Sequence, residues 1–327
     1  MKRLLICLAA ALCGSFAAGA QQPNIVVAKD GSGRYTTVQA AFDAVPAHNK
    51  KTITIFIKNG VYKEKLHLDS TKDFVTLRGE DRFNTILTWD DHPGKISPSG
   101  DSINTRSSYS CLIRADHFSA DNISFQNDAG FTAGQAVAME ADGDQLVFTN
   151  CRFIGNQDIL FTNNDNSRQY YKNCYIEGTT DFIFGSATVW FEQCHIHSKK
   201  NSHVTAASTP AGHPFGYVFY DCVLTGDTSL HSVSLGRPWR PYACVAYIHC
   251  YLGAHLRAEG WSNWNNTDSY KTARYSEYSN YGPGAATMGW VPWSRQLSDE
   301  AVKNYTLKNV LGGWYHEGKD AGGVELK

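Results

Sequence analysis

A short pattern of polar and apolar positions recurs along the middle of the chain. Each copy has a polar residue, a small apolar residue, any residue, and then a large apolar residue. The small position is isoleucine in the first copy and cysteine in the next five: Ile123, Cys151, Cys174, Cys194, Cys222 and Cys250. The intervals are 28, 23, 20, 28 and 28 residues. Repeats of this length, each containing a short alternating strand, are typical of a solenoid.

The segments between the copies also favour strands over helices. Residues 146–149, 189–191, 217–220 and 245–248 are rich in β-branched and aromatic side chains, and helical spacing is nearly absent over the same span. Stacked coils would repeat at the interstrand spacing of about 4.8 Å, so that like residues lie above one another. The pattern therefore predicts an all-β fold, a right-handed parallel β-helix, with loops of uneven length at one corner.

Two segments have the character of caps. Residues 37–45 form an amphipathic pattern that predicts a short helix, with Thr36 or Thr37 at its start and Pro46 after its end. This helix would close the N-terminal end of the core. Residues 294–312 are irregular and partly helical, and we expect them to form the C-terminal cap, because terminal repeats need such covers.

The first twenty residues have the features of a secretory signal peptide. Lys2 and Arg3 precede an apolar run, and residues 18–20 form a small-x-small cleavage signal. The run is too short for a membrane anchor. We expect residues 1–20 to be removed, residues 21–327 to form one domain, and the mature protein to be secreted to the periplasm or the medium as a monomer.

The charge of the chain excludes a general polycation binder. Loss of Lys2 and Arg3 with the signal peptide changes the net charge from −1 to −3, so nucleic acid is not an expected partner. Seven cysteines would remain, an odd number, and an inward ladder of parallel side chains does not suit disulfide geometry. Buried free thiols are the favoured interpretation and disulfides the alternative. No pair has the close spacing of a zinc site.

Two aspartates follow their cysteines by the same interval. Asp158 lies seven residues after Cys151, and Asp181 lies seven residues after Cys174. In a stacked solenoid the two carboxyl groups would be neighbours, and one of them would be driven toward its protonated form. Such a pair supplies an acid together with a base or a nucleophile. The alternative is two ordinary turn aspartates, since their flanks are rich in glycine.

Three further polar residues fit a catalytic interpretation of the aspartates. Gln157 adjoins Asp158, and Gln135 could lie on the preceding coil. Two amides of this kind could donate hydrogen bonds to a developing oxyanion. Arg237, on a later coil, could hold one carboxylate ionised through a two-point contact.

At this point the sequence resembles the pectin methylesterase family, over nearly all of the mature chain. The resemblance rests on the ordered motifs VAKDGSG (27–33), GVYKE (60–64), GQAVAM (134–139), QDILF (157–161), GTTDFIFG (178–185), LGRPW (235–239) and YGPG (281–284). The WSNW motif at 261–264 suggests the bacterial type. Met139, Ile159 and Phe161 depart from the residues usual in the family.

The resemblance implies a parallel β-helix that hydrolyses methyl esters of homogalacturonan (pectin) without a metal or other cofactor. Asp181 would be the nucleophile and Asp158 the acid and base. Gln135 and Gln157 would form the anion hole, and Arg237 would orient Asp181. Four aromatic residues would line the sugar groove: Phe161, Phe184, Trp239 and Trp261.

Other functions remain open at this stage. A pectate lyase or polygalacturonase could use the same solenoid, with a calcium cluster or with acidic residues spaced for glycoside cleavage. A polysaccharide-binding surface protein would need no acid–nucleophile pair, and a thioesterase would prefer thioesters. No serine lies in a G-x-S-x-G motif, so serine hydrolysis is not expected.

Overall fold

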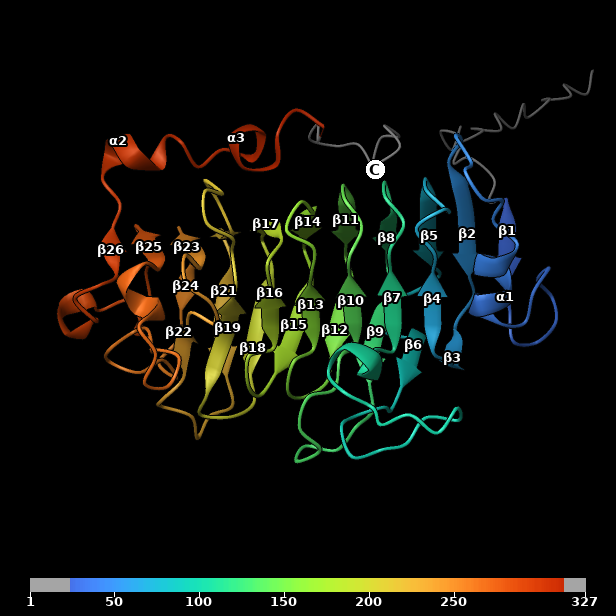
Figure 1. The fold of residues 1–327 in the computed structure, drawn as a ribbon, viewed down its shortest axis with the longest axis horizontal. Helices are drawn as coiled ribbons and strands as arrows, with labels where there is room; N and C mark the ends of the chain where they lie inside the picture. Colours follow the sequence, from blue (N-terminus) through green and yellow to red (C-terminus); the bar gives the residue numbers. More distant parts are fainter. Residues whose placement is uncertain (1–23, 315–327) are drawn as a thin grey trace, which may run out of the picture.

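The computed structural model describes residues 24–314, which wind into a parallel β-helix built from three sheets (Figure 1). Sheet A has, in spatial order, β1 (Ile25–Val27), β2 (Ile53–Ile57), β5 (Val75–Gly79), β8 (Ser119–Asp121), β11 (Leu146–Thr149), β14 (Arg168–Lys172), β17 (Thr188–Glu192), β20 (Tyr217–Tyr220), β23 (Cys244–Ile248), β25 (Arg274–Tyr278) and β26 (Arg295–Gln296). Every strand pair in the three sheets is parallel, as the repeat predicts.

The other two sheets complete each coil. Sheet B has β3 (Gly60–Lys63), β6 (Thr85–Trp89), β9 (Ser124–Asn127), β12 (Arg152–Ile154), β15 (Tyr175–Gly178), β18 (His195–Ser198), β21 (Val223–Gly226) and β24 (Tyr251–Leu252). Sheet C has β4 (Leu66–Leu68), β7 (Cys111–Ile113), β10 (Met139–Ala141), β13 (Leu160–Thr162), β16 (Ile183–Gly185), β19 (His203–Ala207) and β22 (Ser234–Gly236).

The polar residue of the repeated pattern makes the sharp corner between sheets A and B. In all six copies its backbone lies in the left-handed region, with φ between 51° and 58°: Asn122, Asn150, Asn173, Gln193, Asp221 and His249. Asn and Asp tolerate this conformation better than most residues. The next residue then points inward, which is why a small apolar side chain follows.

The interior is filled by stacked ladders of like side chains. The five repeat cysteines are buried, and all seven cysteines of residues 24–314 are free, which agrees with the favoured interpretation of unpaired thiols. A second ladder is aromatic, with ring centroids 4.4 to 4.9 Å apart: Phe148, Tyr171, Phe191, Phe219 and Tyr247. Close packing between coils sets their spacing and makes the solenoid rigid.

The N-terminal end is closed as predicted. Helix α1 (Val38–Asp43) is capped by Thr37, whose side chain accepts a hydrogen bond from the Ala40 amide. Val38 and Phe42 are buried in the main core. The Glu64 carboxylate accepts two hydrogen bonds from amides in the first turn, which fixes the helix on the open end of the core.

The C-terminal segment lies elsewhere than predicted. Helices α2 (Asp299–Val302) and α3 (Leu307–Leu311) run along the outside of sheet A (Figure 1). Val310 and Leu311 pack there against an outward apolar row that includes Trp190. The C-terminal end of the core is instead covered by preceding residues, of which Trp290, Val291 and Trp293 pack against it. The outer face of sheet A is apolar enough to need a cover, and this requirement decides where the segment lies.

Within residues 24–314, three short 3-10 helices lie in loops, at Arg106–Ser108, Ser269–Lys271 and Thr287–Gly289. The first of them overhangs sheet C, where the candidate site lies. None of the helices formed by residues 24–314 has the length and apolar character needed to cross a membrane.

Candidate active site

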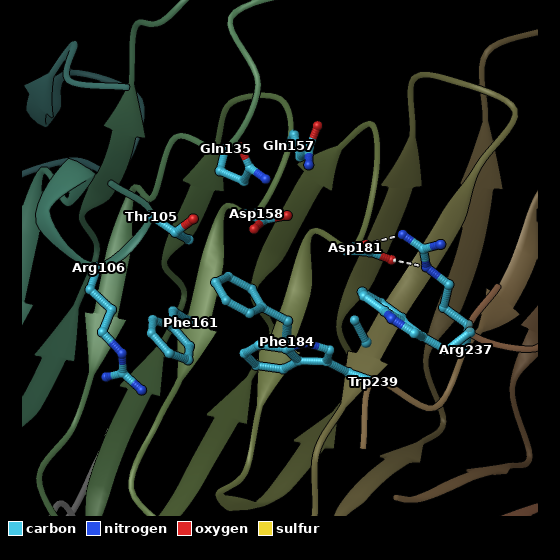
Figure 2. A pocket seen from close by; sticks show the side chains of 12 residues that line it. Thr105, Arg106, Gln135, Gln157, Asp158, Phe161, Asp181, Phe184, Arg237 and Trp239 are labelled. Carbon is cyan, nitrogen blue, oxygen red and sulfur yellow. Dashed lines mark hydrogen bonds and ion pairs between the residues drawn. The ribbon is translucent and has the colours of Figure 1, made fainter. Parts of the chain in front are cut away.

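A cavity of about 350 Å³ opens on the outer face of sheet C, over the middle of the solenoid (Figure 2). Eight of the nine predicted site residues line it: Gln135, Gln157, Asp158, Phe161, Asp181, Phe184, Arg237 and Trp239. They come from four coils, those that contain β10, β13, β16 and β22, and span about a hundred positions of the sequence. Stacking of the coils therefore brings together motifs that are far apart along the chain.

Asp158 and Asp181 occupy equivalent places on neighbouring coils. Each lies two residues before its strand, and the first residues of those strands, Leu160 of β13 and Ile183 of β16, are paired in register. Both aspartates have left-handed backbones, with φ of 61° and 49°. Non-glycine residues in this region are strained by about 1–3 kcal/mol, which neighbouring structure must offset. The turn directs both carboxyl groups into the cavity.

The surroundings of Asp158 favour its neutral form. The side chain is buried, and Oδ1 has no hydrogen-bond partner among residues 24–314. Burial, followed by the nearby Asp181 carboxylate, raises the pKa of Asp158 well above its ordinary value. Asp158 therefore holds a proton at a pH where an exposed aspartate would be ionised.

Asp181 differs from Asp158 because Arg237 binds its carboxylate through two hydrogen bonds. Arg237 Nε donates to Oδ1 at 3.0 Å and Nη2 donates to Oδ2 at 2.6 Å (Figure 2). Burial raises the pKa of Asp181, and the hydrogen bonds and charge of Arg237 oppose that rise. Since the rise is larger for Asp158, the pair has one neutral acid and one carboxylate.

The guanidinium of Arg237 is itself held in place. Its Cζ atom lies 4.0 Å from the centre of the Trp264 ring, a cation–π contact. Arg237 therefore presents a fixed two-point donor to Asp181, which a mobile side chain would not.

The two glutamines lie together at the edge of the cavity, near Asp158 (Figure 2). Gln135 and Gln157 are paired across adjacent coils as an isolated parallel bridge, and the Ala136 amide donates to the Gln157 carbonyl. Both side chains are half-buried and carry amide donors at the mouth of the site. Such donors suit an oxygen that becomes negative during a reaction.

Three of the four aromatic residues predicted to line a sugar groove, Phe161, Phe184 and Trp239, line the cavity and form its aromatic floor. Phe161 and Phe184 stack at 4.3 Å between ring centroids, and Trp239 lies beside Phe184 at 6.0 Å. The prediction for Trp261 is wrong, because this side chain is 1% exposed and packs inside the core against Tyr247 and Tyr275.

Trp264, three residues after Trp261, is the tryptophan of that motif that lines the cavity. Thr105, Arg106 and Ala206 also line it and were not predicted. The WSNW motif contained the signal for Trp264, but which of its two tryptophans faces outward depends on the turn of the backbone. The two residues from the 105–106 loop carry no signal in the sequence.

No three His, Cys, Asp or Glu side chains of residues 24–314 are grouped so that they could hold a metal ion.

Comparison with known proteins agrees with this geometry. The Pectinesterase family model matches residues 24–314. Pectinesterase 31 of Arabidopsis thaliana is 39% identical over 284 residues, 85% of this chain and 89% of that protein. The pectin methylesterase of carrot superposes with a TM-score of 0.82 at 32% identity, covering 90% of this chain and 95% of that chain.

A pectin methylesterase solved in complex with a hexasaccharide is also similar, with a TM-score of 0.81 at 27% identity, covering 90% of this chain and 99% of that chain. Pectinesterase 31 and pectinesterase QRT1, which is 33% identical over 298 residues, both come from the plant Arabidopsis thaliana, so these relatives do not support the predicted bacterial type. The extent of the family match and the identity to its relatives show that this chain belongs to the pectinesterase family.

Proposed function

We propose that this protein hydrolyses methyl esters of polygalacturonate to carboxylates and methanol, with Asp181 as nucleophile and Asp158 as acid and base. The observation that carries the proposal is the difference between the two carboxyl groups. Arg237 holds Asp181 through two hydrogen bonds, while Asp158 is buried with an unpartnered oxygen.

The first half of the reaction forms an acyl-enzyme. An oxygen of the Asp181 carboxylate attacks the ester carbonyl carbon, and the carbonyl oxygen becomes an anion that accepts hydrogen bonds from Gln135 and Gln157. The bond from the carbonyl carbon to the methoxy oxygen then breaks. Asp158 gives its proton to that oxygen, so methanol leaves and an anhydride joins Asp181 to the substrate.

The second half restores the enzyme. Asp158, now a carboxylate, removes a proton from water, and the hydroxide attacks the carbonyl carbon of the anhydride. The bond to Asp181 breaks, which returns Asp181 to its ionised form and releases a galacturonic acid unit, whose carboxyl proton passes to the solvent. Asp158 keeps the proton that it took from water and is ready for another cycle.

The sugar ring next to the reacting ester would lie on Phe161 and Phe184, with Trp239 at one side. The wider assignment is also a proposal. Residues 1–20, which lie outside the described residues, act as a signal peptide, residues 21–327 form one domain, and the protein works outside the cytoplasm as a monomer without a membrane anchor. The bacterial type stays a prediction that rests on the motif at 261–264.

The test is an assay of methanol released from highly esterified pectin by the mature protein, with the chain length of the polymer measured in parallel. We expect methanol without shortening of the polymer. Shortening with unsaturated ends would favour a lyase, and shortening with new reducing ends would favour a glycoside hydrolase. Binding without either product would favour a polysaccharide-binding protein.

Dialysis against a strong chelator gives the first prediction. Activity should be unchanged, because the proposed mechanism polarises the ester with amide donors. Methanol release before and after dialysis measures this directly. Loss of activity that calcium restores would contradict the mechanism and favour a lyase-like site.

A further inference from the structure

A buried carboxyl group lies beside the cavity, and the proposed mechanism does not use it. Glu140 on β10 is 3% exposed, and it is paired in register with Leu112 of β7 on one side and with Phe161 of β13 on the other. Phe161 in turn pairs with Phe184. Glu140 therefore continues the outward row that forms the aromatic floor, in the direction of the N-terminus.

Few polar or charged groups offset the cost of burying the Glu140 carboxyl group. Its Oε1 atom lies 3.6 Å from Arg106 Nη1 and accepts a long hydrogen bond of 3.5 Å from Asn163. The Arg106 guanidinium also lies over the Phe161 ring, 5.1 Å from its centre, and its side chain is 64% exposed. Arg106 thus extends from a loop over the aromatic floor of the cavity. Its guanidinium could pair with another anion in place of Glu140.

A second cavity of about 330 Å³ lies at this end of the groove. Glu140, Arg106, Arg114, His67 and Tyr109 are among its lining residues. Arg106 lines this cavity and the candidate active site, so the two hollows adjoin along sheet C. A polymer that lies along the row of Phe184 and Phe161 would pass next over Glu140.

We propose that Glu140 and Arg106 form a specificity-determining subsite, which binds the free carboxylate of a de-esterified uronate unit when Glu140 is neutral and disfavours it when Glu140 is ionised. The inference rests on the proposed function, because it concerns other units of the same polymer. Neutral Glu140 leaves Arg106 free to pair with the uronate. Ionised Glu140 competes for Arg106 and repels the uronate.

The surroundings of Glu140 place the ionisation of its carboxyl group near neutral pH. Burial, with a smaller contribution from Asp142, raises the pKa of Glu140 to about 7, although Arg106 and Arg114 oppose the rise. Arg114 is paired with Asp142 at 3.5 Å. Burial lowers the pKa of His67 and raises that of Tyr109, so neither carries charge near pH 7. When Glu140 ionises, Arg106 is therefore the cation with which its carboxylate would pair.

The experiment compares two pectins, one highly esterified and one partly de-esterified, between pH 6 and pH 8. The measured quantity is the ratio of kcat/KM for the partly de-esterified pectin to that for the highly esterified one. Protonation of the two aspartates affects both substrates and cancels in the ratio. We expect the ratio to fall about twofold to fivefold as the pH rises, the scale of one partly exposed ion pair.

Glu140→Gln, a neutral side chain of the same shape, should keep the ratio at its pH 6 value throughout. Arg106→Gln should give a low ratio at both pH values, and because Arg106 is exposed this variant should fold even if the buried substitution does not. The matched control is Glu277→Gln, since burial raises the pKa of Glu277 to about 8 but this side chain is not among those lining the groove. Its ratio should follow that of the wild type.

The inference is overturned if Glu140→Gln shows the same fall with pH as the wild type, or if Arg106→Gln leaves the ratio at pH 6 unchanged. Absence of methanol release by the wild type from both pectins would instead contradict the proposed function. The two failures are therefore distinguishable.

Discussion

Asp158 and Asp181 are the same residue type at equivalent positions of neighbouring coils, yet their surroundings favour opposite protonation states. One carboxyl has an unpartnered oxygen, and the other is held by Arg237 at 2.6 and 3.0 Å. At one pH the first carboxyl group is therefore neutral and the second ionised, which the proposed mechanism requires of its acid and its nucleophile.

Asp181→Asn should fold and lose methanol release by at least about a thousandfold, because a neutral amide of the same shape cannot attack the ester. Turnover on highly esterified pectin is the measurement. The control is Asp165→Asn, the same change on an exposed loop outside the cavity, which should keep full activity. Asp181→Asn with a tenth of wild-type turnover would show that another group attacks.

Arg237→Lys separates a fixed two-point contact from simple positive charge. An ammonium cannot make both hydrogen bonds or stack on Trp264, so we expect turnover to fall roughly a hundredfold, about 3 kcal/mol, with KM little changed. The pKa of Asp181 should rise because the two hydrogen bonds from Arg237, which oppose the effect of burial, are no longer both made. The acid limb of turnover should consequently move to higher pH.

The control for Arg237→Lys is Arg240→Lys, which changes a guanidinium stacked on Trp239 that touches neither aspartate. Its pH profile of turnover should match the wild type. Near-normal turnover in Arg237→Lys with only weaker substrate binding would mean that Arg237 belongs to a sugar subsite and that another group orients Asp181.

At the scale of elements, the corner between sheets A and B depends on a left-handed residue in each coil. Asn173 is suited to test this effect because its side chain is exposed and, within residues 24–314, only its backbone makes a hydrogen bond. Asn173→Ala should lower the free energy of unfolding by about 1 kcal/mol, and Asn173→Gly by less, since glycine adopts positive φ without strain. Urea unfolding measures both.

The same two substitutions at Asn166 provide the comparison. This residue is exposed and is not in the left-handed region. The order should reverse there, with glycine the more destabilising change because of its greater flexibility in the unfolded chain. Equal effects at both positions would show that the corner imposes no special demand.

At the scale of the whole molecule, a buried glutamate makes stability depend on pH. Glu277 on β25 is 1% exposed, and burial raises its pKa to about 8. The folded chain therefore keeps a proton that the unfolded chain releases above about pH 4.3. Stability should fall as the pH rises through this window, by about 1.4 kcal/mol per pH unit for one proton, and level off above pH 8.

Glu277→Gln cannot ionise, so its free energy of unfolding should decline less between pH 5 and pH 8 than that of the wild type. Urea unfolding at several pH values provides the measurement. The control is Glu300→Gln, a surface change at a side chain that is 84% exposed, which should leave the slope as it is. An identical slope in Glu277→Gln and the wild type would mean that other groups cause the pH dependence.

The sequence by itself determined the parallel β-helix, its N-terminal helix and the meeting of the two aspartates. These features depend on local chemistry repeated once per coil. A polar residue that tolerates positive φ, a small residue behind it and an equal offset from Cys151 and Cys174 are all readable along the chain. Because the coils stack, residues at the same offset in successive coils become neighbours in space. The local pattern was therefore enough to predict that Asp158 and Asp181 lie side by side.

Only the tertiary structure decided which side chains face the groove and where the last segment lies. Trp261 and Trp264 are three positions apart in one irregular turn, and the path of the backbone buries the first and exposes the second to the cavity. Leu311 covers sheet A because that sheet has its own outward apolar row. Glu140 and Arg106 meet through a loop whose approach depends on packing, which a local pattern in the sequence does not encode.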